Sequence, residues 1–155
     1  DVMWRPGKVR YQGKVYEYND NNEQIKWTYY SASEEINADG YKIKKLRYNE
    51  MDELTGYSTY EYHSNGVVKE EINYESNDDI SSIYKYNEEG KQIEYIAFYY
   101  DGRSHKEEYD SNGNVTKETN YDAEGLITYY KVYQYDENGT YIGFIEYDAD
   151  GNIIE

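Results

Sequence analysis

The sequence predicts an all-β protein: an elongated antiparallel β-meander of repeated hairpins in a twisted or curled sheet. A short motif, Tyr-(Asp/Asn)-x-x-Gly, recurs along the 155 residues. Most copies follow one another at steps of 12 or 14 residues, which leave room for a strand of about 8 residues but not for a helix with its connections. The 24 tyrosines supply rings that pack while their hydroxyls remain near water.

Each copy has the composition of a hairpin turn. We call its first residue the anchor. Copies that keep the Tyr and the Gly begin at the anchors Tyr62, where His63 replaces the Asp or Asn, Tyr86, Tyr109, Tyr121, Tyr135 and Tyr147, and degenerate copies begin at Tyr18, Ile36, Tyr48 and Tyr74. Asp or Asn after the anchor, two free residues and then Gly are typical of a type I turn followed by a left-handed Gly. The Asp or Asn side chain accepts a backbone N–H two residues on. Where Gly is missing, Asn22, Asp52 or Asp78 takes its place, and Asn and Asp tolerate left-handed backbone.

The anchors also predict cross-strand contacts. Each anchor is expected to face the residue six positions later, in the pairs Tyr48–Leu54, Tyr62–Val68, Tyr74–Ile80, Tyr109–Val115, Tyr121–Ile127 and Tyr147–Ile153. Such pairs contribute roughly 0.2 to 1 kcal/mol each. After Tyr86 and Tyr135 the aliphatic residue comes one position later, which predicts an extra bulge. Because side chains alternate along a strand, even steps predict that every anchor returns to the same face.

The domain organisation follows from this array. We expect a single repeat-array domain over residues 1–155, irregular in 1–40 and regular in 41–155. Pro6-Gly7 and Gln12-Gly13 predict short strands near the beginning. Ser31 to Gly40 is expected to form a longer loop or an irregular repeat, and Asp101-Gly102 a tight two-residue turn.

Composition argues against several classes of partner. A net charge of −16 disfavours binding to nucleic acid, because the phosphate backbone repels an acidic surface. The sequence contains no run of about 18 apolar residues, so we expect no membrane insertion. The open edges of a sheet leave a route to edge-to-edge self-association. A protein or a carbohydrate therefore remains as the expected partner.

No motif in the sequence carries catalytic chemistry. It lacks a phosphate-binding loop, a Ser-centred elbow and a His-x-x-x-His pair, and none of its 32 acidic residues is distinguished by context. We expect no enzyme, no cofactor and no metal site. The run Asp148 to Asn152 looks like the start of a calcium loop but lacks the remaining ligands and flanking helices. Turn chemistry accounts for it, with weak calcium binding at acidic turns as the alternative.

Aromatic side chains are the best candidates for ligand contact. Trp27, Tyr29, Tyr57, Tyr130 and Phe144 are the predicted ligand-binding residues. Aromatic side chains on a sheet stack on sugar rings or anchor a protein partner. The alternative is that they cover the second face of a thin sheet.

The run Tyr-Gln-Tyr-Asp-Glu-Asn-Gly at residues 133–139 resembles the YD-repeat (Rhs-type) modules of bacterial surface and toxin proteins. The resemblance covers roughly residues 15–155 and implies a non-catalytic scaffold or envelope, outside the cell or on the bacterial surface. MORN-like envelope repeats are the second candidate. The Arg that often follows the Gly in YD repeats is absent, since Asn114, Leu126, Thr140 and Asn152 stand there. The expected function is a scaffold or display module, with a glycan- or protein-binding module as the alternative.

Overall fold

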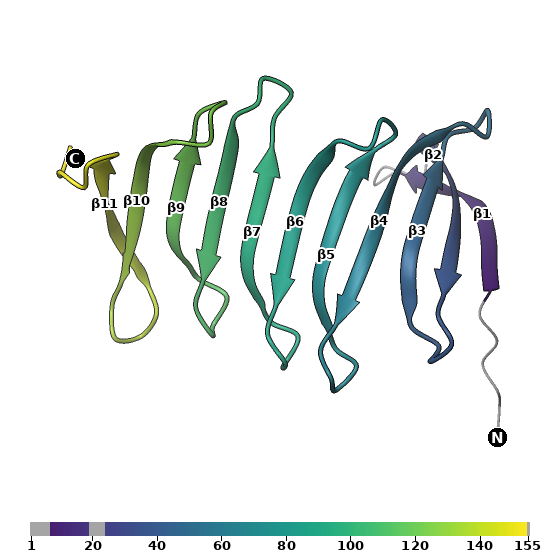
Figure 1. Ribbon diagram of the computed structural model, residues 1–155, viewed down its shortest axis with the longest axis horizontal. Coiled ribbons are helices and arrows are strands. Elements are labelled where there is room, and N and C mark those ends of the chain that lie inside the picture. Colours follow the sequence, from purple (N-terminus) through teal and green to yellow (C-terminus); the bar gives the residue numbers. More distant parts are fainter. Residues whose placement is uncertain (1–6, 19–23, 155) are drawn as a thin grey trace. The chain divides into compact units, whose positions relative to one another are not determined.

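The computed structural model describes residues 7–18 and 24–154, with side chains from Ser31 onward. These residues contain eleven β-strands and no helix. The strands are β1 (Gly7–Tyr18), β2 (Gln24–Ile36), β3 (Lys42–Tyr48), β4 (Leu54–Tyr62), β5 (Val68–Glu75), β6 (Ile80–Tyr86), β7 (Gln92–Phe98), β8 (Ser104–Tyr109), β9 (Val115–Tyr121), β10 (Ile127–Tyr135) and β11 (Tyr141–Asp148). Their order in the sheet follows their order in the chain (Figure 1). The predicted all-β antiparallel meander of hairpins is confirmed.

The chain divides into two compact units. Unit 1 lies within Asp1–Glu61 and Asn73–Asp79, and unit 2 within Tyr62–Ile72 and Ile80–Glu155. Each unit is described by itself.

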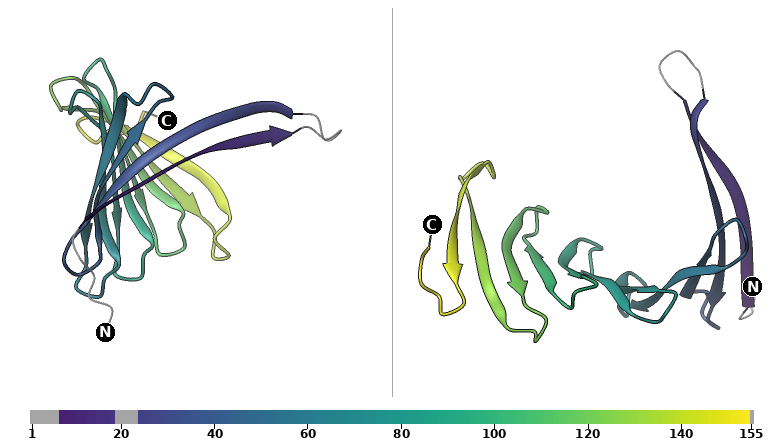
Figure 2. Two further views of the ribbon diagram at one scale, coloured as in Figure 1. Left: turned by 90° about the vertical axis from the view of Figure 1, so that its right-hand side faces the viewer. Right: turned by 90° about the horizontal axis from the view of Figure 1, so that it is seen from above.

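Unit 1 contains the longest hairpin, formed by β1 and β2 (Figure 2). β1 runs without interruption through Gln12 and Gly13, so the prediction of short strands there is wrong. The prediction of a loop from Ser31 to Gly40 is wrong for its first six residues, which belong to β2 and pair with β3. Pairing on both sides decides this segment, because its small residues Ser31, Ala32 and Ser33 are buried there.

Ten turns in the described residues share one hydrogen-bonding pattern. They span residues 37–41, 49–53, 63–67, 75–79, 87–91, 99–103, 110–114, 122–126, 136–140 and 148–152. In each, the fourth N–H donates to the first C=O and the first N–H to the fifth C=O, at 2.8 to 3.2 Å. The fourth residue is left-handed, with φ between 68 and 88°. Asp52 and Asp78 take this conformation, as predicted.

The side chains that cap these turns stand at one of two positions. Asn or Asp is the first turn residue at positions 37, 49, 87, 110, 122, 136 and 148, and its Oδ1 accepts the N–H groups two and four residues on. The other three turns begin with His63, Glu75 and Tyr99. There the third residue, Asn65, Asn77 or Asp101, accepts the N–H two residues on. The predicted cap is confirmed, with a second position added.

The turn between β7 and β8 follows the same pattern and corrects one prediction. Asp101 and Gly102 do not form a two-residue turn, because they occupy its third and fourth positions. Phe98 is the anchor and pairs with Ser104. The motif hides this copy, since Phe replaces the anchor Tyr and Tyr99 replaces the usual Asp or Asn.

A one-residue register shift follows most anchors. It occurs at Tyr18, Ile36, Tyr48, Tyr86, Tyr109, Tyr121 and Tyr135. A bulge is therefore present at Tyr86 and Tyr135, as predicted, but it does not distinguish these two anchors, because the same shift follows most of the others. The strands joined after Phe98 pair without a shift.

The shift makes the anchors of unit 2 alternate between the two sides of the sheet. A β-bulge places two residues opposite one, so an even step plus one bulge changes the side-chain parity. The first face carries the anchors Tyr86, Tyr109 and Tyr135, and the second face carries Phe98, Tyr121 and Tyr147. The step from Phe98 to Tyr109 is 11 residues without a bulge. Because this step is odd, it also places the two anchors on opposite faces. The prediction that all anchors share one face is wrong.

The predicted cross-strand contacts are confirmed for Tyr48–Leu54, Tyr109–Val115, Tyr121–Ile127 and Tyr147–Ile153, which pair directly. Among the residues with described side chains, Ala32 is the one buried hydrophobic residue, with an exposed fraction of 4%. Most tyrosine rings are half-buried on the faces of the sheet. The sheet is held by aromatic rings rather than by an aliphatic core.

Candidate functional site

The predicted ligand-binding residue Tyr57 is packed inside unit 1. Its ring stacks on Tyr74, with 4.5 Å between the ring centroids and 12° between the planes. The Lys44 ammonium lies 4.0 Å from the Tyr57 ring centroid. The Tyr57 hydroxyl donates to Asp78 Oδ1 at 2.9 Å, and this hydrogen bond, with burial, raises the pKa of Tyr57. The ring and hydroxyl of Tyr57 therefore serve contacts within the fold.

Tyr130 has the same environment in unit 2. Its ring stacks on Tyr147 at a centroid separation of 4.8 Å and an angle of 10°. The Lys117 ammonium lies 4.4 Å from its centroid. We call these residues the second triad (Lys117, Tyr130, Tyr147), and Lys44, Tyr57 and Tyr74 the first triad.

The two triads belong to a longer repeat. Each residue of the second triad follows its counterpart by 73 positions, and the same offset relates anchors 36, 48, 62 and 74 to anchors 109, 121, 135 and 147. Residues 42–81 therefore align without a gap to residues 115–154. This period is not visible in the steps between successive hairpin motifs, because it appears only when distant copies are compared.

Phe144 does not share a surface with Tyr130. It pairs with Tyr133, on the first face, whereas Tyr130 lies on the second face with Tyr147. The Phe144 ring centroid lies 6.1 Å from that of Tyr133 and 4.6 Å from the Lys131 ammonium. The strand of Trp27 and Tyr29 is described, but their side chains lie outside the described residues. The structure thus places Tyr130 and Phe144, the two described members of the predicted set in unit 2, on opposite faces of the sheet.

Among the described side chains, the two most exposed aromatic residues, Tyr99 and Tyr100, lie at the turn between β7 and β8. The exposed fraction rises from 38% at Phe98 to 52% at Tyr99 and 99% at Tyr100. Sequence reasoning missed them because it placed the turn at Asp101-Gly102 alone. Reading Phe98 as an anchor places Tyr99 and Tyr100 on the turn.

A polar cluster lies on the first face, where β8 pairs with β9. Glu107 is directly opposite Glu118, and His105 is directly opposite Asn120. His105 Nδ1 lies 3.1 Å from Asn120 Oδ1, and His105 Nε2 lies 3.4 Å from Glu107 Oε1. We call His105, Glu107 and Glu118 the His105 cluster; all three are half-buried. The sequence search did not single it out, because the pairing of Glu107 with Glu118 depends on the bulge after Tyr109.

Two tyrosine hydroxyls bind the carboxylates of the His105 cluster. Tyr109 donates to Glu107 Oε2, and Tyr133 donates to Glu118. Burial and these acceptor carboxylates raise the pKa of both tyrosines, so both remain protonated donors.

On the second face a carboxylate is neutralised by lysines. Glu94 Oε1 lies 2.7 Å from Lys85 Nζ, and its Oε2 lies 3.0 Å from Lys106 Nζ. Burial opposes ionisation of Glu94, but the two ammonium groups outweigh it and lower the pKa. No Lys or Arg of the described residues forms such an ion pair with Glu107 or Glu118.

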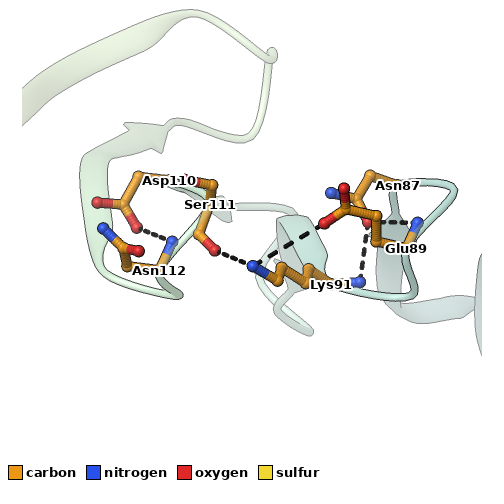
Figure 3. Close-up of polar contacts among 6 residues, drawn as sticks. All are labelled: Asn87, Glu89, Lys91, Asp110, Ser111 and Asn112. Carbon is orange, nitrogen blue, oxygen red and sulfur yellow. Dashed lines mark hydrogen bonds and ion pairs between the residues drawn. The ribbon is translucent and has the colours of Figure 1, made fainter.

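Neighbouring turns at one end of unit 2 contact each other (Figure 3). Lys91 Nζ donates to the Ser111 carbonyl at 2.7 Å and lies 3.9 Å from Glu89 Oε2. Asn65 Nδ2 donates to the Glu88 carbonyl at 2.8 Å. A pocket of about 600 Å³ lies beside these turns, lined by Lys91, Gln92, Tyr109, Ser111, Asn112 and Gly113. Lys91 and Ser111 bond to each other, so we interpret these contacts as links between neighbouring turns rather than as a ligand-binding site.

The acidic turn at Asp148 is organised by its own backbone. Asp148 Oδ1 accepts the N–H groups of Asp150 and Asn152, and the Asn152 amide donates to Oδ2 at 2.9 Å. Both carboxylate oxygens therefore serve the turn, as the turn interpretation of this run predicts.

No protein-family model matches the chain, and no curated protein sequence compared with it matches either. Within the described part of the chain, no helix is long and apolar enough to cross a membrane.

Proposed function

We propose that this protein is a non-catalytic β-hairpin repeat module that acts as a scaffold or display element of a bacterial surface or secreted protein. The observation that carries the proposal is the use of one turn pattern in all ten described turns. Residues that recur in every copy build the hairpin rather than a ligand site. The resemblance to YD-repeat modules supports the assignment to a bacterial surface or secreted protein.

The packing of the recurring aromatic residues supports the same proposal. Both triads use the same stacking and the same ammonium contact. Repeat arrays stabilise each copy through its neighbours and leave turn residues free to vary. The second turn position of this chain varies in the same way, with Glu137 in one copy and Ser64 in the corresponding copy.

A display element should accept new sequence at a turn. We expect a nine-residue epitope inserted between Glu137 and Asn138 to be bound by its antibody while the chain keeps its β-sheet circular dichroism, since a longer loop costs little closure entropy. The matched control is the same insertion within β10, between Val132 and Tyr133, which should unfold unit 2. Equal unfolding by both insertions argues against display at the turns.

The non-catalytic part of the proposal is tested separately. A screen with chromogenic esters, phosphoesters and glycosides should detect no turnover above background by the purified chain. The matched variants are Glu107→Gln and Glu118→Gln, which keep side-chain shape and remove charge. Turnover that one of these substitutions abolishes would overturn the proposal.

A glycan- or protein-binding module is the second candidate function. The exposure of Tyr99 and Tyr100 favours it, since exposed aromatic side chains are common anchors of recognition. A glycan array with the wild type and Tyr100→Ala tests it, with Tyr141→Ala as the exposed aromatic control. Binding that Tyr100→Ala alone removes supports this candidate, and absence of binding by the wild type removes glycans as its ligand. Trp27→Ala in the same array tests the predicted residue whose side chain is not described.

A further inference from the structure

We propose that the His105 cluster is a binding site for a divalent transition-metal ion, for which Zn²⁺ is the best probe. One potential ligand atom from each of His105, Glu107 and Glu118 lies within 4.8 Å of the other two. Zinc–ligand bonds of about 2.0 to 2.2 Å place tetrahedral ligand atoms about 3.3 Å apart. His105 Nε2 and Glu107 Oε1 already have nearly that separation, 3.4 Å. Binding then requires the Glu118 carboxylate to approach by about 1–2 Å, within the range of a side-chain rotation.

The imidazole of His105 is oriented for metal binding. An amide oxygen only accepts hydrogen bonds, so Asn120 Oδ1 fixes the proton of His105 on Nδ1. Nε2, 3.4 Å from Glu107 Oε1, is then the ring nitrogen available to a metal ion. This arrangement is favourable when a cation lies between the two atoms. A histidine that binds metal commonly donates its other N–H to a carbonyl or carboxylate in this way.

Neither carboxylate has a Lys or Arg ion-pair partner among the described residues, because Lys131, which lies opposite Glu118 on β10, pairs with Glu146 instead. Glu107 and Glu118 face each other directly across two strands, and like charges in that position are destabilising. Glu94 has two ammonium partners on the second face, whereas the partners of Glu107 and Glu118 are His105 and two neutral tyrosines. A protonated His105 cancels one of the two negative charges. A divalent metal ion cancels both.

The ligand set selects the class of metal. Imidazole and carboxylate together suit Zn²⁺ and other first-row transition metals, while Ca²⁺ and Mg²⁺ prefer oxygen ligands alone. Tyr109 and Tyr133 bind the carboxylates in the manner of the partners that orient metal ligands. A metal ion at this site would link β8 to β9. Metal binding is a property beyond the proposed scaffold function.

The test is Zn²⁺ binding to chelator-treated full-length chain by isothermal titration calorimetry, with Tm measured in parallel. We expect one Zn²⁺ per chain, a Tm that rises by several degrees in excess Zn²⁺, and no rise with Ca²⁺. His105→Gln and Glu118→Gln should weaken binding by 10-fold or more. Asn120→Ala, which keeps all three ligands, should weaken it by roughly 10- to 100-fold.

His63→Gln is the matched control, because His63 is the other histidine and bonds the Tyr86 carbonyl. It should leave Zn²⁺ affinity unchanged. Circular dichroism of each variant without metal shows whether it is folded, and the calorimetric comparison uses the folded variants. Absence of a Zn²⁺-dependent Tm shift in the wild type overturns the proposal, as does binding that His105→Gln and Asn120→Ala both leave intact.

Discussion

The first and second triads show the same packing twice within one chain. The stacked rings are 4.5 and 4.8 Å apart, with angles of 12 and 10°. The ammonium groups lie 4.0 and 4.4 Å from the ring centroids. The surrounding sequence differs at most positions, and the Lys and Tyr residues at this spacing nevertheless adopt the same local arrangement in both units.

The triads differ at the left-handed position of the following turn. Unit 1 has Asp78 there, with φ 70°, and its carboxylate accepts the Tyr57 hydroxyl. Unit 2 has Gly151, and a Cβ added to it would lie 3.6 Å from the Tyr130 hydroxyl oxygen. Unit 1 thus combines an unfavourable backbone conformation with a side-chain hydrogen bond, while unit 2 has an unstrained glycine.

A second difference lies on the strand that carries the lysine of each triad, β3 in unit 1 and β9 in unit 2. In unit 1 Arg47 faces Gly56, and its guanidinium donates to Ser58 Oγ at 2.7 Å and to the Tyr74 carbonyl at 3.5 Å. The corresponding pair in unit 2 is Asn120 and Tyr129, and Asn120 bonds His105 instead. The same repeat position therefore supports the sheet in one unit and the His105 cluster in the other.

The largest expected effect is that of Gly56→Ala. An added Cβ would lie 2.5 Å from the Tyr74 carbonyl oxygen and 3.1 Å from an Arg47 nitrogen. We expect a loss of about 2–3 kcal/mol in the free energy of unfolding, measured with urea. Gly143→Ala is the control, since Gly143 also has a positive φ and no atom lies within 4 Å of its added Cβ. Equal losses would contradict the assigned role of Gly56.

A substitution at Gly151 tests the difference between the triads. Gly151→Asp copies Asp78 and should form a hydrogen bond with Tyr130, while Gly125→Asp introduces the same left-handed Asp at a position with no neighbour within 4 Å of its Cβ. The loss in the free energy of unfolding should therefore be smaller for Gly151→Asp than for Gly125→Asp by about 0.5–1.5 kcal/mol, the usual net value of a hydrogen bond. The advantage should disappear in the Tyr130→Phe background, and persistence there would exclude the hydrogen bond as its cause.

Acid should weaken the described turns of unit 2 before those of unit 1. Asn37 and Asn49 cap two turns of unit 1, whereas Asp110, Asp136 and Asp148 cap turns of unit 2. Backbone N–H donors at Asn114 and Thr140 lower the pKa of Asp110 and Asp136, and the amide and N–H of Asn152 lower the pKa of Asp148.

A lowered folded-state pKa means that the capping contribution is present above the unfolded pKa of about 3.9 and is lost as pH falls through the folded value. Thermal unfolding of Asp136→Asn and the wild type between pH 2 and 7 checks this. At pH values under about 4, the Tm of the wild type should decrease relative to the Tm of the variant. Glu137→Gln, in the same turn, is the control. If the Tm of the wild type decreases relative to Glu137→Gln as much as relative to Asp136→Asn, the cap is not the cause.

The smallest expected effect concerns the ammonium contacts. Lys44→Met and Lys117→Met keep a long side chain over the ring and remove the charge. Each should cost about 0.5–1 kcal/mol in urea unfolding, with similar values because the two geometries match. A loss confined to one variant would show that the triads are not energetically equivalent.

The turns were predictable from sequence because their chemistry is local. Asp or Asn, two residues and Gly determine both backbone hydrogen bonds, and Asp52 and Asp78 followed from their tolerance of left-handed backbone. The face of each anchor was not predictable from the motif, because the one-residue bulge after it reverses the parity. The same bulge hid the pairing of Glu107 with Glu118. Tyr57 and Tyr130 were placed on strands correctly, but their stacking partners depend on neighbouring strands.

In unit 2 a one-residue bulge after most anchors turns successive anchors to opposite faces of the sheet. The chain has no cysteine, so engineered disulfides test it directly. Glu107 pairs with Glu118 when the bulge is present, and with Lys117 when it is absent. Under mild oxidation, Glu107→Cys/Glu118→Cys should form a disulfide in the folded chain, because directly opposed side chains lie on the same face at the separation a disulfide requires. Glu107→Cys/Lys117→Cys should not, because the side chains at 107 and 117 point to opposite faces when the bulge is present. Preferential cross-linking of positions 107 and 117 would contradict the account.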